Sequence, residues 1–364
     1  MHTHFKQTKL KTIGARARYF LALLKGNLFN EMNPLLIVLI VSNRCNFNCK
    51  YCFGDYFHRR DPDYTTEEVK YIIDEVYNMG TRYLNIHGGE VLLRDDIGEL
   101  VEYIKNKGIY CCLITNGSLI HKKIDQIRNV DNITISLDGR QENNDRIRGK
   151  GTFEIALRGI KLAIREGIPL RVSATLTKYT MNDVEYLANL AKELRFSLYF
   201  NFLFKHIKED VDFVMEDSEI RSKIDQIIEL KKQGYPIMTS PYSLEYARKW
   251  PLDHKKYPFI KEQDLNKLPN GFKPVKCYYS LRKFIIEADG KVWPCITLTD
   301  NELFQPLNWR EVGLRKAINH VRETNTCKTC PGLSQTDHNL LLGLDPRHVT
   351  YLFWNQLKES LRRK

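Results

Sequence analysis

The sequence predicts an α/β fold in which six consecutive strand–helix units build a parallel sheet. From residue 35 to about residue 233, short runs of β-branched and apolar residues alternate with stretches of helical periodicity. Strict alternation of this kind is typical of parallel sheets with right-handed crossovers. At 364 residues and 43% hydrophobic residues, the chain is long and apolar enough to bury one large core with an appendage.

The strands and the clearest helices follow in chain order. The expected strands are 35–43, 82–88, 111–116, 132–137, 170–177 and 197–204. The clearest helices are 65–79, 153–166 and 182–194. Polar or glycine-containing motifs follow four of the strands, at positions where parallel α/β folds bind ligands.

Residues 1–34 precede the sheet and are predicted to form a basic amphipathic helix. Residues 1–30 contain no acidic residue, and apolar residues recur there at helical spacing: Leu10, Ile13, Ala17, Phe20, Leu21 and Leu24. The favoured interpretation is a helix that covers the bottom of the main domain. Peripheral contact with a membrane surface through residues 1–30, or with an acidic partner, is the alternative.

The distribution of basic residues argues against nucleic acid as a partner. The chain carries a formal charge of +12, but outside the N-terminal segment the basic residues are scattered and no recognition motif accompanies them. Nucleic acid is therefore not expected as a partner. The longest apolar run, 34–41, is too short to span a bilayer, which takes about 20 residues.

Beyond the six units, the pattern changes. Residues 234–276 contain six of the 13 prolines and little periodicity, which predicts a linker or a segment that covers the substrate. Residues 277–335 carry four cysteines, and residues 336–364 end in an amphipathic helix. Nine cysteines without a signal peptide indicate a reducing compartment, so we expect a cytoplasmic protein whose thiols bind metal.

Cys45, Cys49 and Cys52 follow the first strand in a C-x3-C-x2-C arrangement. A [4Fe-4S] cluster takes one thiolate for each iron, so three cysteines leave one iron free to bind a small molecule. A zinc site is the alternative that this spacing leaves open.

The cysteine motif, with Tyr51 before its third cysteine, resembles the signature loop of the radical S-adenosylmethionine (SAM) superfamily. The second strand ends in Gly88-Gly89-Glu90, as it does in that family, although Val91 stands where members usually have proline. The resemblance implies a partial (β/α)6 TIM-like barrel over residues 35–233. It also implies that SAM binds the open iron through its amino and carboxylate groups, and that Glu90 pairs with the ammonium.

Further cofactor-binding residues follow from the same resemblance. Ser136 and Arg148 occupy the positions that commonly grip the SAM carboxylate, and Asn116 is expected on the ribose side. Tyr51, Gly88, Gly89 and Glu90 complete the expected set. His87 is interpreted as a core histidine rather than as part of the barrel floor, and Cys111 and Cys112 as buried structural thiols.

A second thiol set is predicted from Cys277, Cys295, Cys327 and Cys330. A hairpin turning at Asp289-Gly290 brings the first two cysteines together, and a C-x2-C pair completes four ligands. Spacing alone does not separate zinc from iron and sulfur. The pattern resembles the twitch form of the SPASM domain, which implies one auxiliary [4Fe-4S] cluster.

The resemblance also implies the chemistry. A reduced flavodoxin- or ferredoxin-type donor would deliver an electron to the first cluster, and a 5′-deoxyadenosyl radical from SAM would take a hydrogen atom from the substrate. An auxiliary cluster that accepts the substrate's electron makes the reaction a net oxidation, either a dehydrogenation or a crosslink. No proton-accepting catalytic residue is singled out.

Several substrate classes stay open. A small molecule is slightly favoured over a peptide or protein substrate, and a lipid-linked substrate is a third class. A non-catalytic zinc-binding module is the alternative from outside enzymes.

Overall fold

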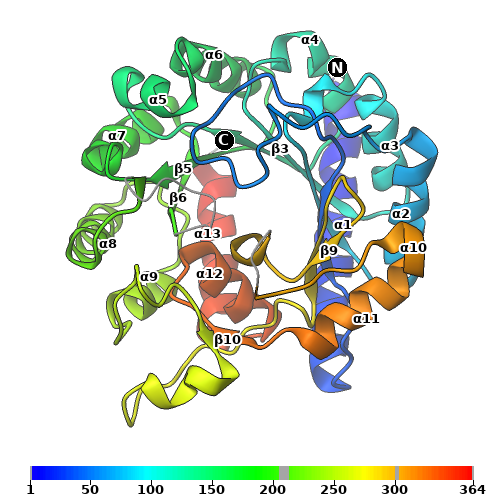
Figure 1. The fold of residues 1–364 in the computed structure, drawn as a ribbon. Helices are drawn as coiled ribbons and strands as arrows, with labels where there is room; N and C mark the ends of the chain where they lie inside the picture. Colours follow the sequence, from blue (N-terminus) through cyan, green and yellow to red (C-terminus); the bar gives the residue numbers. More distant parts are fainter. Residues whose placement is uncertain (1, 205–212, 300–302, 363–364) are drawn as a thin grey trace.

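The computed structural model describes residues 2–204, 213–299 and 303–362, which form a partial barrel ringed by helices (Figure 1). Six parallel strands stand side by side in chain order. They are β1 (Leu36–Ile40), β2 (Tyr83–His87), β3 (Tyr110–Thr115), β4 (Asn132–Ser136), β5 (Leu170–Leu176) and β6 (Ser197–Phe202). The partial TIM-like barrel predicted from the sequence is confirmed, and each strand lies within its expected range to within a residue.

Helices cover the outside of these strands (Figure 1). They are α2 (Thr66–Asn78), α3 (Ile97–Asn106), α4 (Ile120–Ile127), α5 (Gln141–Arg148), α6 (Thr152–Arg165), α7 (Val184–Leu194) and α8 (Asp217–Lys232). Helix α2 shows how the sequence determines where such a helix begins and which side of it is buried. Thr65 and Glu68 form a reciprocal capping box, and Val69, Ile72 and Val76 bury one side of the helix.

Strands β5 and β6 alternate between an apolar outer face and a more polar inner face. In β5, Val172 and Ala174 are fully buried in the core shared with the helices, as are Leu198 and Phe200 in β6. The intervening residues of both strands are only partly buried. Because side chains alternate along a strand, these residues face the interior of the barrel.

The C-terminal segment continues the same sheet, which the sequence did not predict. Strand β8 (Lys283–Ile286) pairs in parallel with β1, and β9 (Val292–Trp293) pairs antiparallel with β8. The predicted hairpin turn is present, with Gly290 at φ 94°. On the opposite edge, α12 (Leu333–Leu342) contacts β6 through a hydrogen bond from the Tyr199 hydroxyl to Asp337 of 2.8 Å. The segment thus occupies the open side of the barrel between β1 and β6.

Residues 234–276 contain more regular structure than their prolines suggested. Helix α9 (Pro241–Arg248) begins at Ser240, whose hydroxyl accepts a hydrogen bond from the Ser243 amide. Strand β7 (Ile260–Lys261) pairs with β10 (Cys327–Thr329). The chain continues through η4 (Glu262–Lys267), η5 (Ile296–Leu298), α10 (Trp309–Val312), α11 (Leu314–Thr324) and α13 (Pro346–Arg362).

Helix α1 (His2–Leu28) lies across the amino-terminal ends of the strands. Arg18 donates a hydrogen bond to the Gly108 carbonyl (3.0 Å), and the rings of Tyr19 and Tyr83 are 5.4 Å apart. The side chains buried against the barrel are Ala15, Tyr19 and Leu23. Of the apolar residues that the sequence singled out, Ile13, Ala17, Phe20 and Leu21 are exposed and Leu24 is partly buried, while the side chain of Leu10 lies outside the described residues. Among the described residues, none of the helices is long and apolar enough to cross a membrane.

Candidate functional site

The three-cysteine loop leaves the carboxyl end of β1 and crosses the mouth of the barrel (Figure 1). Cys45, Cys49 and Cys52 are all partly buried, and none is in a disulfide. The Phe47 amide donates to the Cys45 sulfur at 3.4 Å, and the Cys52 amide donates to the Cys49 carbonyl at 3.0 Å. Burial raises the pKa of Cys45 to about 12 and that of Cys49 to about 11, so ligation of a metal here would release protons.

Glu90 is fully buried and braces the ends of two neighbouring strands. Its Oε1 accepts hydrogen bonds from the Leu92 amide (3.0 Å) and the Thr115 hydroxyl (2.7 Å), and its Oε2 accepts one from the Asn116 amide (2.7 Å). Burial raises the pKa of this carboxyl group. Three of roughly four lone-pair positions are therefore used by the protein itself. The ammonium contact expected from the sequence stays a prediction, and it would use the remaining position on Oε2.

Gly89 is required by a protein contact. A Cβ added there would lie 2.3 Å from the carbonyl oxygen of Arg44 and 2.7 Å from Cβ of Tyr56. The Glu90 amide also donates to the Arg44 carbonyl at 2.8 Å. Gly88 is less crowded, with Ser42 at 3.3 Å. The strand end that carries the two glycines therefore fixes the start of the cysteine loop.

Arg148 lies beside the cysteine loop but is held by a carboxylate of the chain. Its Nε donates to Asp138 Oδ2 at 2.5 Å, and its Nη1 lies 3.9 Å from the Cys49 sulfur. Tyr51 donates to the same Asp138 oxygen at 2.6 Å and also contacts Arg148. Asp138 and Arg148 are both almost completely buried. The sequence analysis singled out Ser136 at this strand end but missed Asp138 as the partner that orients Arg148.

The remaining predicted cofactor residues lie around the same mouth. Ser136 is the last residue of β4, and its hydroxyl has no hydrogen-bond partner among the described residues. Asn116 donates to Asn46 Oδ1 at 2.9 Å and so ties the cysteine loop to the end of β3. His87 lies at the end of β2, where burial lowers its pKa to about 4 and keeps the ring neutral at neutral pH. The predicted contacts of Ser136 and Asn116 with SAM remain predictions, whereas His87 was interpreted as a core histidine.

The four C-terminal cysteines come together from separate segments. Cys277, Cys295, Cys327 and Cys330 line one small cavity, together with Tyr279 and Gln335. The thiols of Cys277 and Cys327 share a hydrogen bond. This bond lowers the pKa of Cys277 and raises the pKa of Cys327 well above its usual value. The Cys277 amide donates to the Lys328 carbonyl at 2.9 Å, which holds the first cysteine beside the C-x2-C pair.

A buried polar cluster adjoins this cavity on the barrel side. Lys283 donates to the Tyr279 hydroxyl at 2.6 Å, and that hydroxyl lies 2.9 Å from His338 Nδ1. Burial lowers the pKa of Lys283 to about 8, while Cys295 and Cys277 act in the opposite direction. No pattern in the sequence marked this cluster, because its members are brought together by β8 and α12.

The donor sets fit iron–sulfur clusters in kind and number. One set has three thiols and the other has four, with an amide or a cation beside each. Within the described ranges, no group of three His, Cys, Asp or Glu side chains gathers closely enough for a single metal ion. Cys111 and Cys112 belong to neither set, since both are buried in β3.

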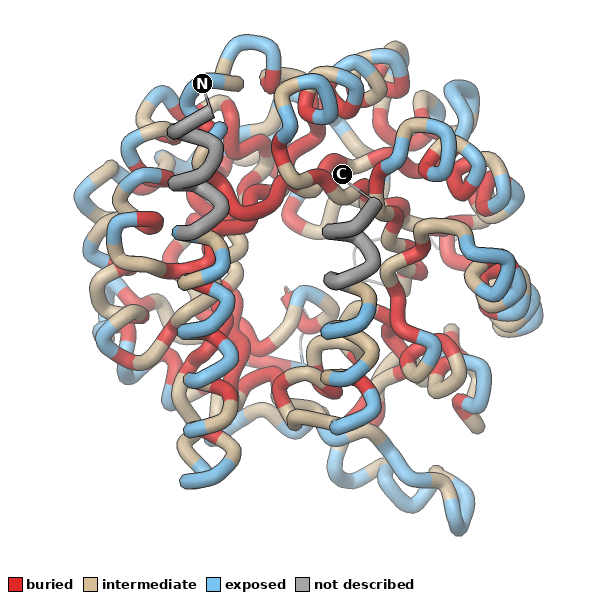
Figure 2. Tube along the Cα trace, turned by 180° about the vertical axis from the view of Figure 1, so that it is seen from behind, coloured by how far each residue is buried: buried red, intermediate tan, exposed pale blue. Residues whose placement is uncertain are grey.

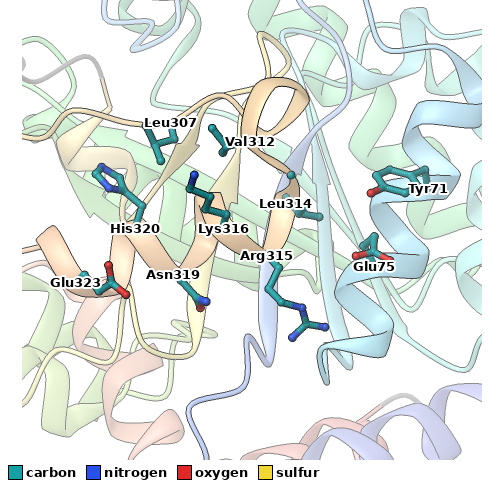
Figure 3. A pocket seen from close by; sticks show the side chains of 11 residues that line it. Tyr71, Glu75, Leu307, Val312, Leu314, Arg315, Lys316, Asn319, His320 and Glu323 are labelled. Carbon is teal, nitrogen blue, oxygen red and sulfur yellow. The ribbon is translucent and has the colours of Figure 1, made fainter.

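A groove elsewhere on the molecule lies away from these residues. This groove of about 620 Å³ runs between α2 and α11, with Tyr71 and Glu75 on one side and Arg315 and His320 on the other (Figure 3). None of the predicted ligand residues lines it. The groove is therefore not part of the candidate site.

Comparisons with known proteins match the barrel to a known enzyme family. The model of the Radical SAM superfamily matches residues 39–191. The Fe-coproporphyrin III synthase of Methanosarcina barkeri is 30% identical over 228 residues, covering 57% of this chain and 55% of that protein. The mycofactocin maturase MftC of Mycolicibacterium smegmatis is 31% identical over 163 residues, covering 43% of this chain and 42% of MftC. The chain spans about half the length of the curated relatives it matches.

Among solved structures, Streptococcus suis SuiB bound to S-adenosylmethionine has a similar fold. Its TM-score is 0.63 at 18% identity, with coverage of 82% of this chain and 70% of SuiB. A partial barrel of parallel strands with a three-cysteine loop at its mouth defines a class of enzymes built around an iron–sulfur cluster. Residues 39–191 therefore match a radical SAM domain, which confirms the resemblance seen in the sequence. Members of this family bind a [4Fe-4S] cluster and SAM, and the SPASM-type relatives carry auxiliary clusters.

Proposed function

We propose that this chain is a radical SAM oxidoreductase that oxidises a polar substrate inside the barrel. When bound, the first cluster and SAM supply a 5′-deoxyadenosyl radical, which takes a hydrogen atom from the substrate. Cys45, Cys49 and Cys52 would hold that cluster. Cys277, Cys295, Cys327 and Cys330 would hold the auxiliary cluster, whose chemistry would be to accept the second electron that a substrate loses, together with a proton, in a net oxidation.

One observation carries the proposal: a polar wall faces the barrel interior beside the C-terminal segment that carries the second thiol set. Every alternate residue of β5 and β6 on the inner face is polar, namely Arg171, Ser173, Thr175, Ser197, Tyr199 and Asn201. A closed barrel core fills such positions with apolar side chains. Hydroxyl and amide groups at these positions instead suit a substrate that carries its own hydroxyl or amide groups.

The chain's own residues perform the positioning. Asp138 holds Arg148 beside Cys49, and Glu90 fixes the ends of β2 and β3 on which the ligand would rest. Arg59 and Tyr56, which follow the cysteine loop, both bind the buried Glu287 at the end of β8, at 3.1 and 2.5 Å. The loop and the C-terminal hairpin are therefore clamped together, which favours a fixed separation between the two thiol sets.

A peptide maturase is the second candidate. The relative MftC is named a maturase, and SuiB has been solved with its precursor peptide SuiA at a TM-score of 0.62 and 17% identity. The polar wall would accept a peptide side chain as well as a free small molecule. A lipid-linked substrate is a third candidate, since its polar headgroup could reach the same wall.

The test is anaerobic reconstitution followed by assays for iron, sulfide and SAM cleavage. We expect about eight irons per chain, because two cubane clusters hold four each, and 5′-deoxyadenosine on addition of SAM and a reductant. Zinc without iron, or no 5′-deoxyadenosine, would overturn the proposal in favour of a zinc-binding module. Deuterium transfer into 5′-deoxyadenosine from labelled polyols or labelled peptides then separates the two leading substrate classes.

A further inference from the structure

Helix α1 has two apolar faces, and the barrel covers only one of them. Ala15, Tyr19 and Leu23 are buried against the strand ends. On the other face, Ile13 and Leu21 are 62% and 63% exposed, and Leu28 is 78% exposed. Phe20 lies in the same stripe and is 40% exposed. With 3.6 residues per turn, these four residues follow one line along the helix.

Basic residues border this outer stripe. Lys11, Arg18 and Lys25 recur every seven residues along one edge, and Arg16 lies along the other edge. All four are exposed, although Arg16 lies over the Tyr110 ring (5.6 Å), Arg18 binds the Gly108 carbonyl and Lys25 lies 3.3 Å from Glu31. No acidic residue occurs between residues 1 and 30 to oppose them. The outer face is thus an apolar line between two cationic edges.

A second exposed apolar group lies on the same side of the molecule. On α13, Phe353 and Trp354 are 65% and 54% exposed. Seen from behind the barrel mouth, α1 and α13 both lie in front of the strands (Figure 2). The cysteine loop lies on the opposite side (Figure 1). Both helices therefore carry exposed apolar side chains and lie on the side of the strands opposite the cysteine loop.

We propose that the outer face of α1 docks on an anionic phospholipid surface. Its apolar line would enter the boundary between headgroups and acyl chains, while Lys11, Arg16, Arg18 and Lys25 meet the lipid phosphates. The exposed Trp354 of α13 suits the same boundary, where tryptophan is enriched. The charge pattern selects this occupant over a second copy of the chain, because two such faces would bring like charges together.

The experiment measures binding of the full-length, cluster-loaded protein to vesicles by flotation. We expect binding to vesicles of equal parts phosphatidylglycerol and phosphatidylcholine, roughly tenfold weaker binding to phosphatidylcholine alone, and weakening by added salt. Leu21→Glu and Phe20→Glu should each reduce binding to the anionic vesicles by roughly tenfold or more, because each places a charge where an apolar group should enter. Both side chains are exposed, so the thermal unfolding midpoint should not change.

The matched control is Ile164→Glu on the outer helix α6, where Ile164 is 37% exposed. It should bind vesicles as the unaltered protein does. Absence of vesicle binding, or equal loss in Ile164→Glu, would overturn the proposal. So would a dimer, seen by light scattering without lipid, that Leu21→Glu dissociates. Vesicle binding is read without catalysis, so this outcome is independent of the proposed oxidation.

Discussion

The two thiol sets of this protein are built in opposite ways. Cys45, Cys49 and Cys52 lie in one loop that follows a single strand, whereas the four C-terminal cysteines come from segments spread between residues 277 and 330. The first set has Arg148 beside it and the second has the buried Lys283. Ligands in one loop depend on local backbone contacts, and ligands from several segments depend on the packing of the whole C-terminal part. Substitutions in the two sets should therefore have different effects on cluster binding and on SAM cleavage.

The largest difference is expected when the cysteines themselves are removed. Cys45→Ala, Cys49→Ala and Cys52→Ala together should abolish 5′-deoxyadenosine formation and halve the iron content. Cys327→Ala with Cys330→Ala should also halve the iron, but SAM cleavage should continue without substrate oxidation. The measurements are iron content and chromatographic detection of 5′-deoxyadenosine.

The control for this comparison is Cys112→Ala, which removes a buried thiol outside both sets. Its iron content should equal that of the unaltered protein. Loss of SAM cleavage in the Cys327/Cys330 variant with the first cluster intact would show that the sets do not act separately.

The second expected difference is in thiol reactivity of the metal-free protein. Burial holds the pKa of Cys45 at about 12 and that of Cys49 at about 11, whereas a hydrogen bond from Cys327 lowers the pKa of Cys277. At pH 8 a thiol of pKa 11 is about one part in a thousand thiolate, and only the thiolate reacts. Iodoacetamide should therefore label Cys277 roughly tenfold or more faster than Cys49, as followed by mass spectrometry.

The same pKa shifts predict how the stability of the metal-free protein depends on pH. A raised thiol pKa favours the folded state while the thiols are protonated. The unfolded chain loses these protons first, near pH 8.5 to 9 by its ordinary values, so the stability contribution falls as the pH rises from about 9 towards 12. Equal labelling rates for Cys277 and Cys49 would contradict the expected difference in reactivity, and a free energy of unfolding that does not fall between pH 9 and pH 12 would contradict the expected pH dependence.

The smallest expected effect comes from Gly89→Ala, which disturbs only the first set. The new Cβ would meet the Arg44 carbonyl at 2.3 Å, so the start of the cysteine loop must shift. Overpacking of this kind costs about 1–3 kcal/mol. The equilibrium constant between the native loop conformation and a displaced one would therefore fall roughly 5- to 150-fold. We expect slower SAM cleavage with an unchanged auxiliary cluster, measured by cleavage rate and by electron-spin spectra of each cluster.

Gly14→Ala provides the matched control, because a Cβ there meets only the flexible Arg18 side chain at 3.5 Å. It should leave both clusters and the cleavage rate unchanged. If Gly89→Ala also left the first cluster and its SAM cleavage unchanged, the loop would not depend on this contact.

Local patterns in the sequence were sufficient for the barrel. The six strands were predicted because apolar runs alternate with helical periodicity, and that alternation follows from burial under the outer helices. The joining of β8 to the edge of β1 was not predicted, because the residues between them carry no signal for a shared sheet. The face of α1 that packs was also missed. Its large side chains suggested the buried stripe, but the barrel instead takes Ala15, Tyr19 and Leu23, where a small residue allows close approach.

The hydrogen-bond partners of the site residues could not be predicted from local sequence patterns either, because they come from distant parts of the chain. Arg148 was expected to meet a ligand carboxylate, and the structure shows it bound to Asp138. Lys283, Tyr279 and His338 meet only after β8 and α12 have packed. Contacts of this kind depend on tertiary placement, which spacing along the chain does not encode.

The position of α1 at the amino-terminal ends of the strands sets the direction from which a substrate can arrive. A protein resting on a bilayer through this helix would stand upright with its mouth turned to the water, roughly 20 Å above the headgroups for strands of this length. A substrate anchored in the same leaflet would then need a tether long enough to reach from the membrane surface, along the outer helices, to the mouth of the barrel. Freely diffusing molecules would face no such obstacle.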